Sequence, residues 1–94
     1  MKVQWLASGL KSLADIQVYI AERNPRVAVA VRSAIRRAAN QLADFPHAGR
    51  AGLIPETREL IVNKHPYIIV YRVADTTVEI LRVHHDATNW MGTH

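Results

Sequence analysis

Apolar residues alternate with polar residues at the start of the chain and then recur at helical spacing. Val3 and Trp5 alternate with polar neighbours, which predicts a short half-buried strand over residues 2–6. Ser8 is a candidate N-cap for a helix that is expected to stop near Arg23. The positions that share one stripe at helical spacing are Leu10, Leu13, Ala14, Gln17, Ile20 and Ala21.

A second helix is indicated by the pair Asn24-Pro25. Asparagine supplies a capping side chain, and proline at the first helical position lacks only an N–H that would have no helical partner. The helix is expected to end before Phe45-Pro46, because proline disfavours helical geometry in the residue before it. Its apolar stripe is Val27, Val31, Ile35, Ala38 and Leu42. The two helices are therefore predicted to form a hairpin over about residues 8–44.

The second half of the chain has the composition of strands. Residues 46–57 carry two prolines and two glycines without periodicity, which is typical of a loop. β-branched and aromatic residues then predict an antiparallel meander over about residues 58–85, with a turn at residues 74–77. Its middle segment, 67–73, is apolar on both faces, as in a central strand covered by the hairpin. The expected order is β-α-α-β-β-β, an α+β fold with a helical hairpin packed on a small antiparallel sheet.

Length and composition limit what this fold can carry. With 94 residues the chain has room for one core, so a single domain over residues 1–94 is expected, ending in a tail at residues 86–94. The absence of cysteine and of long apolar runs predicts a cytoplasmic protein that does not associate with membranes. No motif for a nucleotide, cofactor or small-molecule substrate is present.

Positive charge predicts an anionic partner. The net charge is +4 at pH 7 and the sequence pI is about 10.0. The second helix has four arginines and no acid between Pro25 and Ala43. These arginines, with Trp90 of the tail as an aromatic anchor, are candidates for a partner-binding surface; the four are Arg26, Arg32, Arg36 and Arg37. The alternatives are a solvated arginine face and a tryptophan that packs on the sheet.

Two adjacent histidines close the last predicted strand. Successive side chains of a strand point to opposite faces, so His84 and His85 are not expected to share a metal ion. Regular alternation would place Arg82 and His84 on one face with Ile80, where the positive end is suited to a phosphate. Both a structural role and acid–base catalysis remain open for the histidines.

Four short motifs, taken together, resemble the RelE/ParE superfamily of toxins from bacterial toxin–antitoxin modules. The motifs are Pro-x-x-Gly-Arg, Arg-Glu-Leu, Tyr-Arg and Val-x-His. They are matched by Pro46, Gly49, Arg50, Arg58, Glu59, Leu60, Tyr71, Arg72, Val83 and His85. The details look more like the ParE branch than the RelE branch. The resemblance also implies a cognate antitoxin whose acidic amphipathic tail becomes ordered on the hairpin and sheet.

The two branches differ in biochemical class. ParE-like toxins poison DNA gyrase without catalysis of their own, whereas RelE-like toxins cut messenger RNA in the ribosome. Cleavage by the 2′-hydroxyl requires a base, an acid and cations that stabilise the charge on the reacting phosphate. On the RelE reading these groups would come from Arg58, Lys64, Arg72, Arg82, His84 and His85. This set is thin for a nuclease. Gyrase inhibition is therefore the leading interpretation, and ribosome-dependent RNA cleavage is the alternative.

Overall fold

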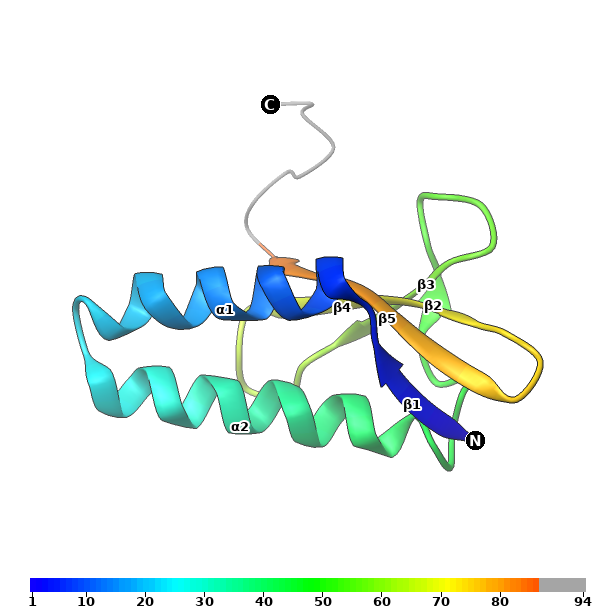
Figure 1. Cartoon of the computed structure of the whole chain (residues 1–94), viewed down its shortest axis with the longest axis horizontal. Helices are drawn as coiled ribbons and strands as arrows, with labels where there is room; N and C mark the ends of the chain where they lie inside the picture. Colours follow the sequence, from blue (N-terminus) through cyan, green and yellow to red (C-terminus); the bar gives the residue numbers. More distant parts are fainter. Residues whose placement is uncertain (87–94) are drawn as a thin grey trace.

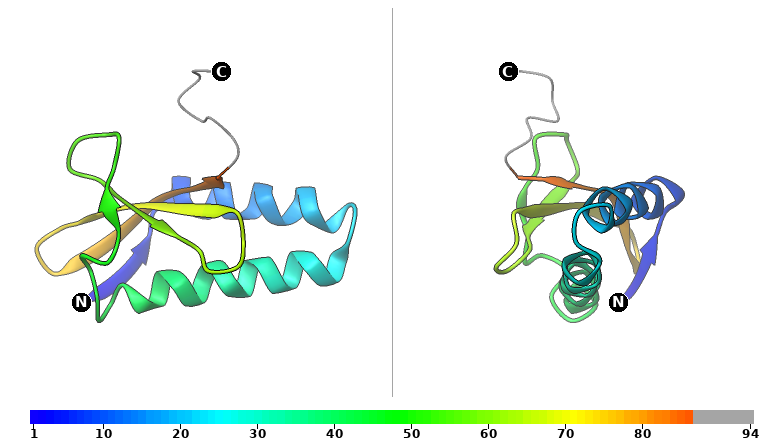
Figure 2. Two further views of the ribbon diagram at one scale, coloured as in Figure 1. Left: turned by 180° about the vertical axis from the view of Figure 1, so that it is seen from behind. Right: turned by 90° about the vertical axis from the view of Figure 1, so that its left-hand side faces the viewer.

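The computed structural model describes residues 1–86, in which two helices pack on one face of a five-stranded mixed sheet (Figures 1 and 2). The elements are β1 (Lys2–Trp5), α1 (Ala7–Ala21), α2 (Pro25–Gln41), β2 (Arg50–Ala51), β3 (Arg58–Ile61), β4 (Tyr67–Val73) and β5 (Thr77–His85). The strand order is β1-β5-β4-β3-β2, with β1 parallel to β5 and the other pairs antiparallel. The predicted α+β fold with a helical hairpin and a meander is confirmed.

The prediction for residues 46–57 was incomplete, because this segment contains a short strand. β2 pairs Arg50 with Glu59 and Ala51 with Arg58, so it covers only the first half of β3. Two residues are too few to give a periodic hydrophobic signal.

The second helix begins as its sequence predicts. The Asn24 side chain accepts a hydrogen bond from the N–H of Val27 at 3.3 Å. Val31, Ile35 and Leu42 are buried, while Val27 in the first turn is 44% exposed. Within residues 1–86, neither helix combines the length and apolar character needed to cross a membrane.

The predicted cap of the first helix is wrong. α1 begins at Ala7, and its N-cap residue, Leu6, provides no side-chain hydrogen bond. Ser8 lies inside the helix, and its hydroxyl donates to the carbonyl of Leu81 on β5 at 2.7 Å. The predicted stripe is also partly wrong, since Leu10 is 48% exposed while Gly9 and Leu13 are the buried residues of this helix. Both differences arise because the first turns of α1 lie against β5.

The contact between α1 and β5 is a close approach of backbone to backbone. A Cβ atom at Gly9 would lie 2.6 Å from the carbonyl oxygen of Ile80, so only glycine fits here. β1 reaches along β5 as far as the pair Trp5–Ile80. Beyond that point two serines of α1 bond to the backbone of β5. Ser8 donates to the carbonyl of Leu81, and Ser12 Oγ accepts from the N–H of Val83 at 2.9 Å. The helix thus supplies hydrogen bonds that a longer edge strand would otherwise make.

A β-bulge changes which side chains of β5 share a face. Val70 of β4 pairs with Arg82, but the next residue, Tyr71, pairs with Ile80, leaving Leu81 as the extra residue. Ile80 and Val83 therefore both face the helices and belong to the core. The expectation that Ile80 shares a face with Arg82 and His84 is wrong, because one inserted residue reverses the alternation.

Tyr71 ties the loop after α2 to the centre of the sheet. Its side chain is fully buried, its hydroxyl donates to the carbonyl of Pro46 at 2.8 Å, and it accepts from the N–H of Gly49 at 2.9 Å. A Cβ atom at Gly49 would lie 2.7 Å from that hydroxyl oxygen. Glycine is therefore required for the loop to close over the tyrosine.

Tyr71→Phe is expected to lower the free energy of unfolding by about 1–3 kcal/mol, because the buried N–H of Gly49 and carbonyl of Pro46 each lose a partner. Urea unfolding followed by circular dichroism measures the change. Tyr19→Phe is the matched control, since Tyr19 is 60% exposed and its loss of a hydroxyl should change stability by less than about 0.5 kcal/mol. Equal stability of Tyr71→Phe and the wild type would contradict the role given to the buried hydroxyl.

Candidate functional site

The sheet separates the six candidate catalytic residues instead of gathering them. Arg58 pairs with Tyr71 and His85 pairs with Tyr67, and both tyrosines belong to the core between sheet and helices. The opposite face, which no helix covers, carries Arg72, Arg82 and His84. Lys64 lies in the turn between β3 and β4. The groups needed for RNA cleavage are thus divided among two faces and a turn.

Arg58 holds the loop that precedes β2. Its guanidinium Nη1 donates to the carbonyl of Gly49 at 2.8 Å and to that of His47 at 3.3 Å. These are the carbonyls of the same loop whose N–H and C=O groups bind the Tyr71 hydroxyl. The geometry gives Arg58 a structural role.

His85 packs against an aromatic ring on the helix side of the sheet. The centroids of its imidazole and of the Tyr67 ring are 5.3 Å apart in an edge-to-face arrangement. Burial raises the pKa of Tyr67, and Tyr19 adds a smaller effect in the same direction. The Tyr67 phenol therefore stays protonated at neutral pH and cannot serve as a base.

The helix-free face keeps part of the predicted cationic set together. Arg72 and Arg82 line a hollow of about 360 Å³, together with Val70, Leu81 and the loop residues 54–57. Arg72 Nε is hydrogen-bonded to Glu79 Oε1, its cross-strand partner, which offsets one of the two positive charges. This hollow therefore brings two of the six candidates together on the helix-free face.

His84 lies beside Arg82 on the same face but is only 7% exposed. Its Nδ1 is 3.1 Å from the carbonyl oxygen of His85. Burial, followed by the Arg82 charge, lowers the pKa of His84 against the raising effects of the His85 carbonyl, Glu59 and Asp86. The imidazole is therefore neutral at pH 7, and its contact with the backbone matches the structural reading of a histidine at a strand end.

Glu59 of the Arg-Glu-Leu motif is a buried carboxylate whose ion pair was not predicted from the sequence. It is 6% exposed and accepts from Arg50 Nε at 3.2 Å, from Arg50 Nη2 at 3.0 Å and from the N–H of Leu53 at 3.3 Å. The pair fixes β2 and the following loop on the helix-free face. Such a buried charge is retained only when it is paired, and the pairing of Arg50 with Glu59 follows from the register.

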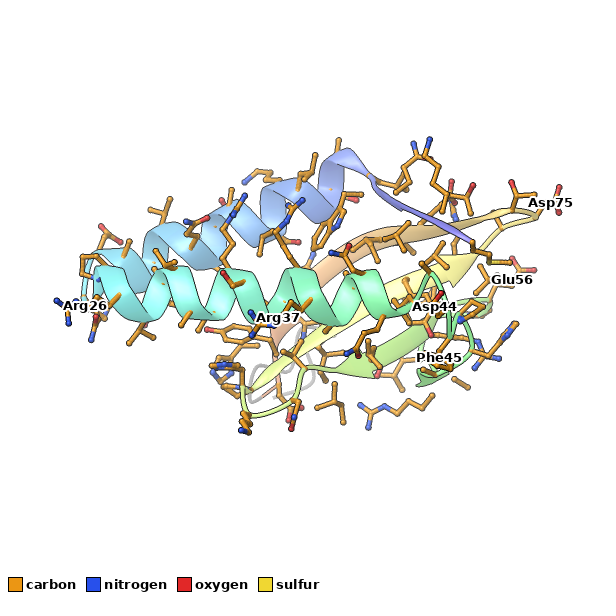
Figure 3. The ribbon with its side chains drawn as sticks, turned by 90° about the horizontal axis from the view of Figure 1, so that it is seen from below. Arg26, Arg37, Asp44, Phe45, Glu56 and Asp75 are labelled. Carbon is orange, nitrogen blue, oxygen red and sulfur yellow. The ribbon has the colours of Figure 1, made fainter. Side chains whose placement is uncertain are left out.

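The four arginines of α2 do not form one patch. The Arg36 guanidinium carbon lies 5.8 Å from the centroid of the Trp5 ring, and Arg32 precedes it by one turn on the same flank. Arg26 lies near the tip of the hairpin, whereas Arg37 lies beside the middle of the helix (Figure 3). Trp90, the remaining candidate for partner binding, lies outside the described residues.

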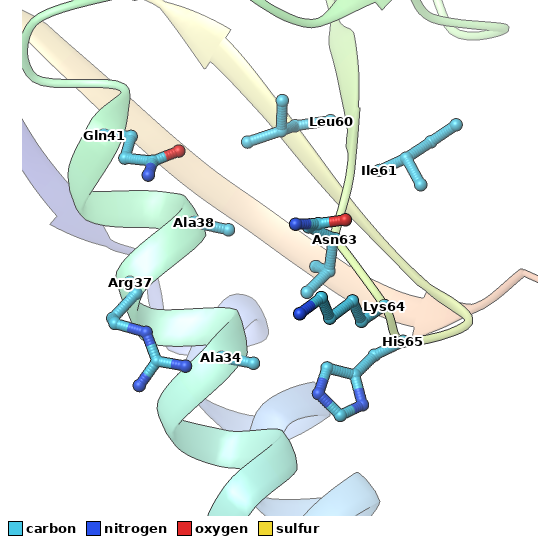
Figure 4. Close-up of a pocket in the computed structure, with 10 residues that line it drawn as sticks. Ala34, Arg37, Ala38, Gln41, Leu60, Ile61, Asn63, Lys64 and His65 are labelled. Atoms are coloured by element: carbon cyan, nitrogen blue, oxygen red, sulfur yellow. The ribbon is translucent and has the colours of Figure 1, made fainter.

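Arg37 and Lys64 instead meet across a cleft that the sequence did not predict. The cleft, about 310 Å³, separates α2 from the end of β3 and the turn that follows (Figure 4). Gln41, Asn63 and His65 line it as well. Among residues 1–86, no three histidine or acidic side chains come together in a way that would hold a metal ion.

The model of a known family matches almost the whole chain. The family is described as the ParE toxin of the type II toxin–antitoxin system parDE, and the match spans residues 3–90. The chain belongs to the ParE toxin family. It is a toxin of the type II toxin–antitoxin class within the ParE/RelE superfamily.

Two similar proteins are also named as toxins. Putative toxin Y4kP of Sinorhizobium fredii is 39% identical over 89 residues, which are 95% of this chain and 92% of that protein. Toxin RelE2 of Caulobacter vibrioides is 37% identical over 86 residues, covering 92% and 96% of the two chains.

Two solved toxin–antitoxin structures share the fold. A chain of the chromosomal ParDE system from P. aeruginosa superposes with a TM-score of 0.82 at 23% identity, covering 90% of this chain and 95% of that one. A chain of the RelBE2 toxin–antitoxin complex from Mycobacterium tuberculosis gives a TM-score of 0.59 at 25% identity, covering 93% and 92%.

The residues that carried the ParE resemblance build a structural unit in this chain. Gly49 and Pro46 bind the Tyr71 hydroxyl, Arg58 binds two carbonyls of the same loop, and Arg50 pairs with Glu59. The motifs therefore mark the scaffold of this ParE-family toxin.

Because the pKa of His84 lies below the usual 6.5 in the folded state, the unfolded chain takes up a proton first as the pH falls. The contribution of His84 to stability is therefore complete above about pH 6.5 and is lost progressively below it. His84→Gln should reduce the loss of unfolding free energy between about pH 7.5 and about pH 5 relative to wild type. His47→Gln, a change at an exposed histidine, is the control and should keep the wild-type slope. Identical slopes for wild type and His84→Gln, measured by urea unfolding at both pH values, would exclude this account.

Proposed function

We propose that this chain inhibits DNA gyrase as a ParE-like toxin and is neutralised by a cognate antitoxin, without catalysing a reaction itself. The observation that carries the proposal is the separation of the six candidate catalytic residues. Arg58 and His85 face the helices, Lys64 lies in a turn, and the other three lie on the opposite face. An acid, a base and a charge-stabilising group must surround one reacting phosphate, and this arrangement does not supply them at one point.

The similarity to known proteins supports the same branch. The family model that matches residues 3–90 is that of a ParE toxin, and the structure with a TM-score of 0.82 belongs to a ParDE system. Inhibition of gyrase requires a docking surface and no reactive group, which is compatible with a scaffold in which the residues of the family resemblance serve the fold.

We propose that the antitoxin contacts α2 on the flank of Arg32 and Arg36. An acidic amphipathic segment requires cations and apolar side chains on the same surface. Val29, Arg32 and Arg36 follow one another at steps of about one helical turn, so they share one flank of α2. The Val29 side chain is 61% exposed there. Arg26, near the tip of the hairpin, and Arg37, which lines the cleft beside β3, lie apart from this surface.

RNA cleavage remains a second candidate because of one observation on the helix-free face. Arg72 and Arg82 line the same hollow, and His84 lies next to Arg82 on that face. Two cations can hold a phosphate, and a neutral histidine can accept a proton. Two relatives carry the name RelE, at 37% and 31% identity.

The deciding experiment incubates the purified chain with gyrase, relaxed plasmid DNA and ATP. Loss of supercoiling together with accumulation of cleaved DNA, both reversed by the antitoxin, is the expected result. Arg82→Ala should leave inhibition within about threefold of wild type, because this reading assigns no proton transfer or phosphate binding to Arg82.

The opposite outcome is equally specific. A folded preparation that binds the antitoxin but leaves gyrase unaffected would remove the gyrase proposal. If the same preparation cut messenger RNA on translating ribosomes, and Arg82→Ala and His84→Gln each abolished cutting, the nuclease reading would replace it.

A further inference from the structure

The cleft beside α2 is open because two helix residues facing β3 are small. Ala34, Arg37, Ala38 and Gln41 are spaced by three, one and three residues, which places them along one flank of the helix. The alanines contribute only methyl groups, so a space of about 310 Å³ remains between the helix and residues 60–65. A void of this size lies at the lower end of the range of small-molecule sites.

The rim of the cleft consists of groups that donate hydrogen bonds. In Figure 4 the amino group of Lys64 and the amide of Asn63 point from the β3–β4 turn toward α2, where Arg37 and Gln41 lie. The His65 ring lies next to Lys64 at the same opening. The residues between positions 1 and 86 that line the cleft include no acid. Two permanently charged side chains, Arg37 and Lys64, thus line the cleft, and no carboxylate is among its described lining residues.

The turn that presents these groups is held by the backbone. Lys64 adopts a left-handed conformation with φ of 68°, which side chains other than glycine or asparagine seldom adopt. The N–H of Val62 donates to the carbonyl of Tyr67 at 2.9 Å, and the N–H of Tyr67 donates to the carbonyl of His65 at 2.9 Å. Backbone strain of this kind is maintained only where the surroundings fix it, and here it directs the Lys64 side chain to the cleft.

We propose that this cleft is a binding site for a phosphate group. A phosphate monoester carries about −1.5 to −2 charges at pH 7 and three strongly accepting oxygens, which matches one guanidinium, one ammonium and two amides better than a single carboxylate does. Arg37 supplies the planar fork for two oxygens, and Lys64 supplies the point charge from the opposite wall. The site is separate from the Arg72–Arg82 hollow on the other face of the sheet, and it does not depend on whether gyrase or RNA is the target.

Two sources of phosphate share this chemistry, a free nucleotide and the backbone of a nucleic acid. The volume of the cleft admits more than an inorganic phosphate, and its lining contains no aromatic ring for base stacking apart from the His65 imidazole. The arms of the experiment below distinguish these sources.

The test titrates the ¹⁵N-labelled chain with inorganic phosphate, with ATP and with a short single-stranded oligonucleotide, and follows amide shifts by NMR. Shifts centred on Arg37, Gln41 and residues 63–65 are expected, with binding weakened at least about tenfold in Arg37→Gln and in Lys64→Gln. Lys11→Gln is the matched control, because it removes one charge from an exposed lysine on α1 and should leave the affinity unchanged. Unaltered circular dichroism of the variants excludes unfolding as the cause.

The outcomes separate the possibilities. Binding of ATP and phosphate without a gain for the oligonucleotide supports the site and assigns it to free nucleotides. Stronger, salt-sensitive binding of the oligonucleotide supports the site and assigns it to a nucleic-acid backbone. The proposal would be overturned if Lys11→Gln weakened phosphate binding as much as the cleft variants do, or if no shifts occurred at the cleft. A poly-glutamate peptide that bound there more tightly than ATP would also overturn it, in favour of a protein carboxylate as the occupant.

Discussion

The hydroxyl of Tyr71 is the interaction on which the rest of the structure depends. It lies in the central part of the sheet and bonds both to Pro46 and to Gly49, so the chain leaving α2 is fixed against β4 before β2 begins. Arg58 then fixes the carbonyl side of the same loop. Without this contact, the long segment between the hairpin and β3 would be held by the two-residue strand β2 and by the side chains of Arg58 and Glu59. The residues that resemble a family pattern are therefore required for the path of the chain.

The bulge at Leu81 determines which chemistry can occur on which face. It brings Ile80 and Val83 into the same core and turns Arg82 and His84 away from it. Ser8 and Ser12 of α1 bond to the backbone of Leu81 and Val83, the residues on either side of Arg82. The position of Arg82 therefore depends on the contact between α1 and β5. A change at Ser8 or Gly9 would therefore alter the helix-free face without touching any residue on it. The separation of Arg58 and His85 from Arg72 and Arg82 follows from the register and the bulge.

The elements other than β2, their order and the hairpin were predictable from the sequence, because periodicity and the Asn24-Pro25 cap are local signals. The central position of β4 in the sheet followed from its apolar residues on both faces. Side-chain facing along β5 was not predictable, since a one-residue bulge leaves no mark on composition. The phosphate cleft was hidden for another reason: Arg37 and Lys64 are far apart in the chain, and the space between them arises from two alanines that look like ordinary helix formers.

The brevity of β2 has a consequence for the behaviour of the free chain in solution. β2 pairs only with Arg58 and Glu59, whereas β3 continues to Ile61, whose side chain is 53% exposed. In an antiparallel sheet, alternate residues direct their N–H and C=O groups to the outer neighbour, so the second half of β3 presents backbone groups beside an apolar side chain. Such an edge is a template for the same segment of another copy. A partner that covered this strand would therefore also keep free chains from pairing edge to edge.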